Sequence, residues 1–157
     1  MGAPYYDVAS FAPRISLGYL VRRINKLSVA RIEATFDGSE ISFTQWIVLA
    51  LVSSGIATTC AELSRNMDHN SGAMTRVIDQ LEERGLLVRR RDNDDRRVSN
   101  LSITEAGSQT VHELVGRVVD IWNDILGDFD HDEITRLIAT LSKLLARLES
   151  PEPQPEA

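Results

Sequence analysis

The 157-residue sequence predicts a mainly α-helical protein with one small β-hairpin. Apolar residues recur every three or four positions along most of the chain, which is typical of amphipathic helices. The spacing changes between residues 86 and 103, where two short runs of aliphatic residues flank the sequence Asp92-Asn93-Asp94-Asp95. Such runs on either side of a polar turn are typical of a hairpin. Helix-capping sequences ahead of the apolar stretches support the same fold class.

Start and stop signals divide the helical part into six expected helices. In a capping box, the N-cap side chain and the Glu or Gln three residues later satisfy two backbone N–H groups at the start of a helix. Three such pairs are present, and Asn70 or Ser71 and Thr104 can cap two further helices. The pairs are Ser42 with Gln45, Thr59 with Glu62 and Asp130 with Glu133, and the sequences that end helices are Asp37-Gly38, Ser53-Ser54-Gly55, Gly85 and Gly127.

The segment from Thr59 to Thr104 has the element order of a winged helix-turn-helix. Its second helix keeps a small, polar N-terminal face free of the apolar stripe, and a hairpin with five arginines follows at once. The major groove of B-DNA admits one helix, and an arginine at a loop tip can enter the narrow minor groove. We therefore expect this segment to bind double-stranded DNA. The polar face comprises Asn70, Ser71, Gly72, Ala73, Thr75 and Arg76, and the hairpin arginines are Arg89, Arg90, Arg91, Arg96 and Arg97.

The net charge of −6, from 17 Lys and Arg against 23 Asp and Glu, argues against DNA binding by bulk charge. The charge is distributed unevenly, however. Residues Arg84 to Arg97 contain six arginines and three aspartates, so this segment is +3 and the rest of the chain is −9. The acidity therefore lies outside the expected wing. A salt-bridged surface is the alternative interpretation of the arginine cluster.

Other function classes find little support in the sequence. Cys60 is the only cysteine, which excludes a disulfide within the chain and a cysteine-based zinc ribbon. His69, His112 and His131 lack metal-ligand spacing, and neither a serine–histidine–acid arrangement nor a phosphate-binding glycine loop is visible. We expect no metal, no cofactor and no enzyme activity. With no signal peptide and no apolar run of about 18 residues, we expect a cytoplasmic protein without membrane contact.

The sequence Asp92-Asn93-Asp94-Asp95-Arg96-Arg97 is the most specific of six segments that form a recognisable pattern. The others are Ser42-Phe43-Thr44-Gln45-Trp46, Leu63-Ser64, Gly72-Ala73-Met74-Thr75-Arg76, the run from Asp79 to Leu87, and Leu101-Ser102-Ile103-Thr104. Through these segments the chain resembles the multiple-antibiotic-resistance regulator (MarR) family of bacterial transcription factors, from about Leu17 to Leu148. One departure is Asn93, where many members carry proline.

The resemblance implies roles for particular residues. Arg97 would enter the minor groove at the wing tip, Asp95 would brace it, and Arg96 would lie near a phosphate. Ser71, Ala73, Thr75 and Arg76 would face the major groove. Together with the groove argument above, the expected DNA-binding residues are Asn70, Ser71, Ala73, Thr75, Arg76, Arg90, Asp95, Arg96 and Arg97.

Members of this family are obligate homodimers, and the last helix indicates a dimer independently. Its apolar stripe is too long for this chain to cover alone, although packing within the chain is the alternative. A twofold dimer sets two recognition helices about 34–36 Å apart, which fits an inverted-repeat operator. The expected organisation is an extended N-terminal arm at 1–13, a helical dimerisation region at 14–38 and 105–149, the winged helix-turn-helix at 39–104, and a disordered tail at 150–157.

The resemblance also implies a small effector, bound between the dimerisation helices and the winged domain, that releases a repressor from DNA. An aromatic carboxylate, a phenol and an acyl thioester are the expected chemical classes. Tyr19, Arg23 and Trp46 are the expected wall residues, and Arg23 either pairs with a carboxylate or forms an interhelical salt bridge. Two other functions stay open: a thiol-based redox sensor that uses Cys60, which is otherwise a buried unreactive cysteine, and a winged-helix interaction module without DNA binding.

Overall fold

The computed structural model describes residues 4–91 and 99–150. The expected wing-tip residues Asp95, Arg96 and Arg97 and the tail at 151–157 lie outside these ranges. The chain forms two compact units, Met1–Val118 and Val119–Ala157, and the boundary between them falls inside one helix. The expected division at residues 38 and 104 separates a dimerisation region from a DNA-binding domain. That division depends on a second chain and stays a prediction.

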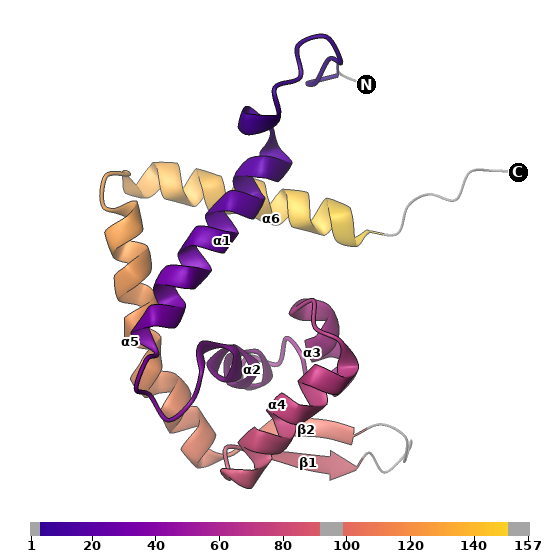
Figure 1. Cartoon of the computed structure of the whole chain (residues 1–157), viewed down its shortest axis with the longest axis vertical. Helices are drawn as coiled ribbons and strands as arrows, with labels where there is room; N and C mark the ends of the chain where they lie inside the picture. Colours follow the sequence, from indigo (N-terminus) through magenta and orange to yellow (C-terminus); the bar gives the residue numbers. More distant parts are fainter. Residues whose placement is uncertain (1–3, 92–98, 151–157) are drawn as a thin grey trace, which may run out of the picture. The chain divides into compact units, whose positions relative to one another are not determined.

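The prediction of a mainly helical fold with one antiparallel hairpin is confirmed (Figure 1). None of the described helices is long and apolar enough to cross a membrane. The elements are a 3-10 helix η1 (Pro13–Ile15), α1 (Leu17–Thr35), α2 (Phe43–Ser53), α3 (Cys60–Asn66), α4 (Ser71–Glu83), β1 (Leu87–Arg91), β2 (Ser99–Ile103), α5 (Glu105–Leu126) and α6 (His131–Glu149).

Local capping chemistry sets the helix boundaries as expected. All three predicted capping boxes are formed, at the starts of α2, α3 and α6. Asn70 caps α4, since its side chain accepts a hydrogen bond from the Ala73 N–H at 2.8 Å. Thr104 Oγ1 likewise accepts from the Gly107 N–H at 3.0 Å at the start of α5. After α4, Gly85 has a φ of +70°, a left-handed conformation that glycine adopts without strain.

The hairpin pairs β1 with β2 in a register that places Leu87 opposite Ile103 and Arg91 opposite Ser99. A third segment joins the free edge of β2, because the Leu101 N–H donates to the Thr58 carbonyl at 2.7 Å. The residues just before α3 therefore continue the sheet, so the wing and the helix-turn-helix share backbone hydrogen bonds. The sequence analysis did not predict this pairing.

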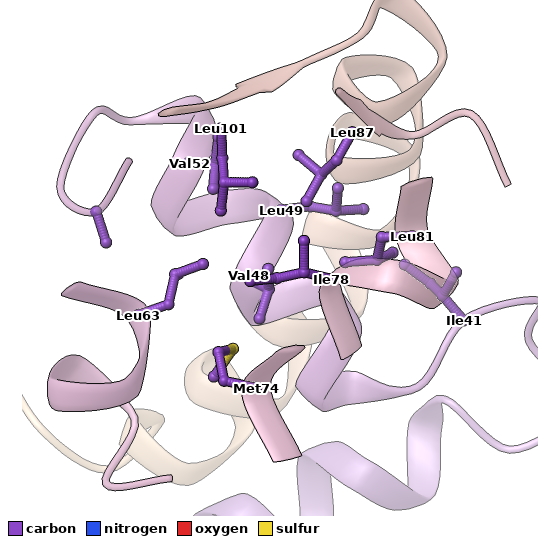
Figure 2. Packing of buried hydrophobic residues seen from close by; sticks show 11 residues of the cluster. Ile41, Val48, Leu49, Val52, Leu63, Met74, Ile78, Leu81, Leu87 and Leu101 are labelled. Atoms are coloured by element: carbon purple, nitrogen blue, oxygen red, sulfur yellow. The ribbon is translucent and has the colours of Figure 1, made fainter. Parts of the chain in front are cut away.

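One hydrophobic core holds α2, α3, α4 and the hairpin together (Figure 2). Leu49, Leu63 and Ile78 come from the three helices and are each fully buried. Leu87 and Leu101 add the inner face of the hairpin, since alternate residues of a strand point to the same side. This shared core fixes the position of β1 relative to α4, which decides where the hairpin arginines lie.

The N-terminal arm is not a single extended segment. Its backbone turns back where the Ser10 N–H donates to the Asp7 carbonyl at 3.2 Å. Tyr6 then contacts the Phe11 ring edge-on at 5.4 Å, and its hydroxyl accepts from the Leu17 N–H at 2.8 Å. The arm is thereby tied to the first turn of α1.

Candidate nucleic-acid interface

Helix α4 has one face in the core and the opposite face in solvent. Met74, Ile78 and Leu81 are fully buried, and Val77 is half-buried beside them. The residues Ser71, Gly72, Thr75 and Arg76 are exposed. The expected DNA-facing residues of α4 are thus brought together on one face, except that Ala73 is half-buried.

Two of the exposed polar groups on this face already have partners within the chain. Asn70 Oδ1 is the N-cap acceptor, so only its amide N–H₂ is free for a new contact. Thr75 Oγ1 donates to the Ser71 carbonyl at 2.8 Å and lies 3.6 Å from the half-buried Cys60 Sγ. Arg76 forms no hydrogen bond or ion pair with another described residue, so its guanidinium keeps its full set of donors.

The arginines of β1 fall on two different faces of the hairpin. Arg89 follows Leu87 on the inner side and bridges to α4, with Nη2 at 2.5 Å from Asp79 Oδ1 and Nη1 at 2.6 Å from Glu82 Oε2. The hydrogen bond to Asp79 raises the pKa of Arg89, with a further contribution from the negative charge of Glu82. Arg90, one residue on, points to the other face and is exposed. Arg89 therefore attaches the hairpin to α4, whereas Arg90 is left exposed to solvent.

None of the cavities found among the described residues is lined by all three expected effector-wall residues. Tyr19 and Arg23 line a shallow hollow of about 280 Å³ on α1 together with two other basic side chains. Trp46 instead packs with the chain's aromatic core: its ring stacks on Phe43 at 5.9 Å, and its Nε1–H donates to the Val111 carbonyl at 3.3 Å. Trp46 also contacts Phe36, thirteen residues along α1 from Arg23, which is a rise of about 20 Å.

A larger cavity of about 530 Å³ lies between α1, α2 and the turn that joins α3 to α4. Its walls include Glu33 on α1, Ile47 on α2 and Asp68 in the turn, none of which the sequence analysis singled out. They are separated along the chain, so no local motif signals them. The remaining lining residues are Asn25, Val29, Phe43, Thr44, Leu51, Asn66, Met67 and His69.

Comparisons with known proteins agree with this geometry. Residues 41–99, which span α2 to the start of β2, match the MarR family. Over 134 residues the chain is 26% identical to the multiple antibiotic resistance protein MarR of Escherichia coli K12, covering 83% of this chain and 92% of that protein. The chain is therefore similar to the MarR family through its helix-turn-helix and hairpin. Members of that family are transcriptional regulators, as the resemblance found in the sequence implies.

Solved MarR-type structures show the same winged-helix fold. The transcriptional regulator BldR from Sulfolobus solfataricus is 25% identical with a TM-score of 0.73, covering 83% of this chain and 93% of that one. Bordetella bronchiseptica BpsR, whose DNA binding is described as regulated by 6-hydroxynicotinic acid, is 23% identical with a TM-score of 0.72, covering 90% and 99%. The predicted fold class and the resemblance to the MarR family are therefore both confirmed.

Proposed function

We propose that this protein is a MarR-type regulator, a homodimeric repressor that binds an inverted-repeat operator and leaves it when a small aromatic or phenolic molecule binds. The observation that carries the proposal is the exposed polar face of α4. Its opposite face is locked into the core by Met74, Ile78 and Leu81, so the free face has a fixed orientation. A helix presented in this way fits the major groove with its first turns at the base edges.

In the proposed complex, different residues supply different contacts. Arg76 offers a bidentate donor pair to a guanine, and Ser71 offers a hydroxyl at the helix N-terminus, where the backbone N–H groups also favour a phosphate. Arg90 reaches a phosphate from the outer face of the hairpin. The wing-tip residues Asp95, Arg96 and Arg97 keep the roles that the family resemblance implies for them.

The dimer accounts for two apolar helix faces that the described part of the chain leaves in solvent. On α1, five large apolar side chains are between 43% and 57% exposed, and on α6 five are between 40% and 74% exposed. Monomeric proteins rarely leave such apolar faces uncovered, and contact with a second copy of the chain would remove each of them from water. The residues are Leu17, Leu20, Val21, Ile24 and Leu27 on α1, and Leu137, Ile138, Leu141, Leu145 and Leu148 on α6.

The 530 Å³ cavity is the best-placed effector site. Its size is in the range that small molecules occupy, and its walls include residues of two different functional parts. Glu33 lies on the proposed dimerisation helix α1, while Asp68 and His69 immediately precede Asn70, the N-cap of α4. A ligand that contacts both sides fixes the distance between α1 and α4. It favours one spacing of the two recognition helices by its differential affinity for that spacing.

Wild-type protein and DNA suffice for the test. Duplexes are selected from a random library, and the affinity for the recovered sequence is measured by fluorescence anisotropy between 50 and 200 mM salt. We expect an inverted repeat, two chains per duplex, and an affinity that falls by roughly 10³-fold or more over this range for six or more phosphate contacts. Enrichment of no sequence, with binding independent of salt, contradicts the proposal and favours the interaction-module alternative.

A further inference from the structure

We infer that the cavity between α1, α2 and the α3–α4 turn selects an aromatic cation, an ammonium or amidinium compound, over an aromatic carboxylate. This inference rests on the proposed effector site and names the chemistry of its ligand. The expected classes from the resemblance include an aromatic carboxylate, and the similar structure of BpsR is described with such an acid. The side chains around this cavity favour the opposite charge.

The walls give the cavity an apolar lining suited to an aromatic ring. Phe43 is buried, and Val29, Ile47, Leu51 and Met67 are each half-buried. Four of these side chains are aliphatic or thioether groups that contact either face of a ring through dispersion, and Phe43 can pack against it edge-on. A planar hydrophobic ligand therefore gains from contact with several elements at once, whatever its charge.

The charges at the rim decide which polar group the ring carries. Glu33 lines the cavity from α1, and Asp68 lines it from the α3–α4 turn. The described lining contains no lysine or arginine. Neither carboxylate forms an ion pair or a side-chain hydrogen bond with another described residue, so both keep their acceptors free. An ammonium or amidinium group can donate to them. A carboxylate would meet two like charges and no cationic partner.

The third polar group adds an acceptor. His69 Nδ1 lies 2.6 Å from the Met67 carbonyl oxygen, and a carbonyl only accepts, so the proton of the neutral ring is on Nδ1. Its Nε2 then carries a lone pair. Glu33, Asp68 and His69 together offer oxygen and nitrogen acceptors to the N–H groups of one cationic ligand.

Asp68 also supplies a sharp mutational probe. It has a φ of 51°, and within the described ranges it is the only non-glycine residue in the left-handed region. Asparagine adopts this conformation as readily as aspartate does. Asp68→Asn therefore removes the charge and keeps the turn, whereas most other substitutions would disturb the helix-turn-helix itself.

Three biphenyl compounds that differ only in one group test the inference: 4-phenylbenzamidine, which is a cation, 4-phenylbenzamide, which is neutral, and 4-phenylbenzoate, which is an anion. Their Kd values for the full-length protein are measured by isothermal titration calorimetry at low salt. We expect the amidine to bind about tenfold more tightly than the benzoate, since each of the two exposed carboxylates contributes up to about fivefold of attraction to the cation and also repels the anion. In Glu33→Gln/Asp68→Asn the preference should shrink to within about twofold, while Glu149→Gln on α6 should retain it.

The possible results test the cation preference of the cavity separately from the proposed release of DNA by an effector. Tighter binding of the benzoate, an amidine preference that survives in the double variant, or no binding by any of the three overturns the inference. Circular dichroism confirms that each variant is folded. DNA release is measured separately on the selected duplex: binding of the amidine without DNA release supports the ligand class and contradicts the proposed regulation, whereas release by the benzoate alone supports the regulation and overturns the ligand class.

Discussion

Nη2 of Arg89 lies 2.5 Å from Oδ1 of Asp79, so a basic residue of the wing is bound to the helix beside it. The second bridge, to Glu82, comes from the next turn of α4 and completes a two-point attachment. Both terminal nitrogens of its guanidinium are engaged in these bridges, so this side chain is held against α4. The cluster of arginines in β1 is therefore divided between structure and binding.

The substitutions Arg89→Ala and Arg90→Ala should separate these two roles. All three bridging side chains are about one-third to one-half exposed, so the loss of Arg89 should lower the free energy of unfolding by only about 0.5–1 kcal/mol. Arg90→Ala should leave stability within about 0.5 kcal/mol of wild type and reduce the salt slope of DNA binding by about 1. Urea unfolding and anisotropy titrations measure the two quantities. A stability loss in Arg90→Ala together with a reduced salt slope in Arg89→Ala would contradict the assignment of these arginines to two faces of β1.

Gly107 and Gly116 should respond in opposite directions to alanine. A Cβ at Gly107 would collide with the Leu86 carbonyl oxygen and lie 2.8 Å from Ile103 Cγ1, so the start of α5 has no space for it beside the hairpin. We expect a loss of about 2 kcal/mol or more. At Gly116, on the same helix, a Cβ meets nothing within 4 Å, and alanine should stabilise by about 0.5–1 kcal/mol. Thermal unfolding of both variants checks the contrast, and equal effects would contradict the packing.

The capping box at the start of α3 should make stability depend on acid pH. The backbone N–H of Thr58 donates to Glu62, and this bond, with those from Thr59, holds the pKa of the Glu62 carboxyl below its ordinary value. A carboxyl with a lowered folded-state pKa stabilises fully above its unfolded pKa, and the contribution is lost as the pH falls through the folded pKa. Glu62→Gln should lose stability at neutral pH and flatten the stability curve in the acid range. Unfolding at a series of pH values shows this; an unchanged acid slope would argue against the capping role.

The neutral half of the same box can be tested at constant charge. Thr59 Oγ1 accepts from the Glu62 N–H at 3.2 Å, so Thr59→Ala should cost about 0.5–2 kcal/mol. Because the Thr59 side chain also helps to lower the pKa of Glu62, part of this loss should disappear at acid pH, where Glu62 is protonated in the wild type as well. Urea unfolding at neutral and acid pH measures it.

A charge on the apolar face of α6 should break the dimer. Leu141 is 40% exposed in the described chain and lies at the centre of the α6 stripe. Burying a glutamate there between two copies would leave an unpaired charge, so Leu141→Glu should give a monomer that loses operator binding. Ser142→Glu changes the charge by the same amount on the neighbouring, polar face. Sedimentation velocity should find Ser142→Glu dimeric, and a dimeric Leu141→Glu would place the interface elsewhere.

Local signals explain why much of the fold could be predicted. Ser42 and Gln45 are three residues apart, so their capping box depends on chemistry within one turn of helix. Gly85 ends α4 for a similarly local reason. The bridge from Arg89 to Asp79, by contrast, needs the shared core to bring β1 against α4. The sequence alone does not distinguish Arg89 from Arg90. The strand pairing has to be known before each residue can be assigned to one face of the hairpin.

The proposed effector site is the part least predictable from the sequence, because its walls come from separate parts of the chain. Trp46 was expected in its wall, but its indole is held by the Val111 carbonyl and by neighbouring aromatic rings. Asp68 gave no signal in the sequence, because a single aspartate before a helix is ordinary turn chemistry. Its importance emerges only when α1 and α2 are placed around it.

The central claim is that the exposed face of α4 reads DNA, and Arg76 tests it most directly. The selected duplex is titrated with wild type, Arg76→Ala, and Arg136→Ala, an arginine on the exposed polar face of α6 that matches the change in charge. We predict that Arg76→Ala weakens binding by about 1–3 kcal/mol, roughly five- to 150-fold, and relaxes the preference at one base pair of each half-site. Arg136→Ala should stay within about twofold of wild type. Equal affinities for all three folded proteins would contradict the account.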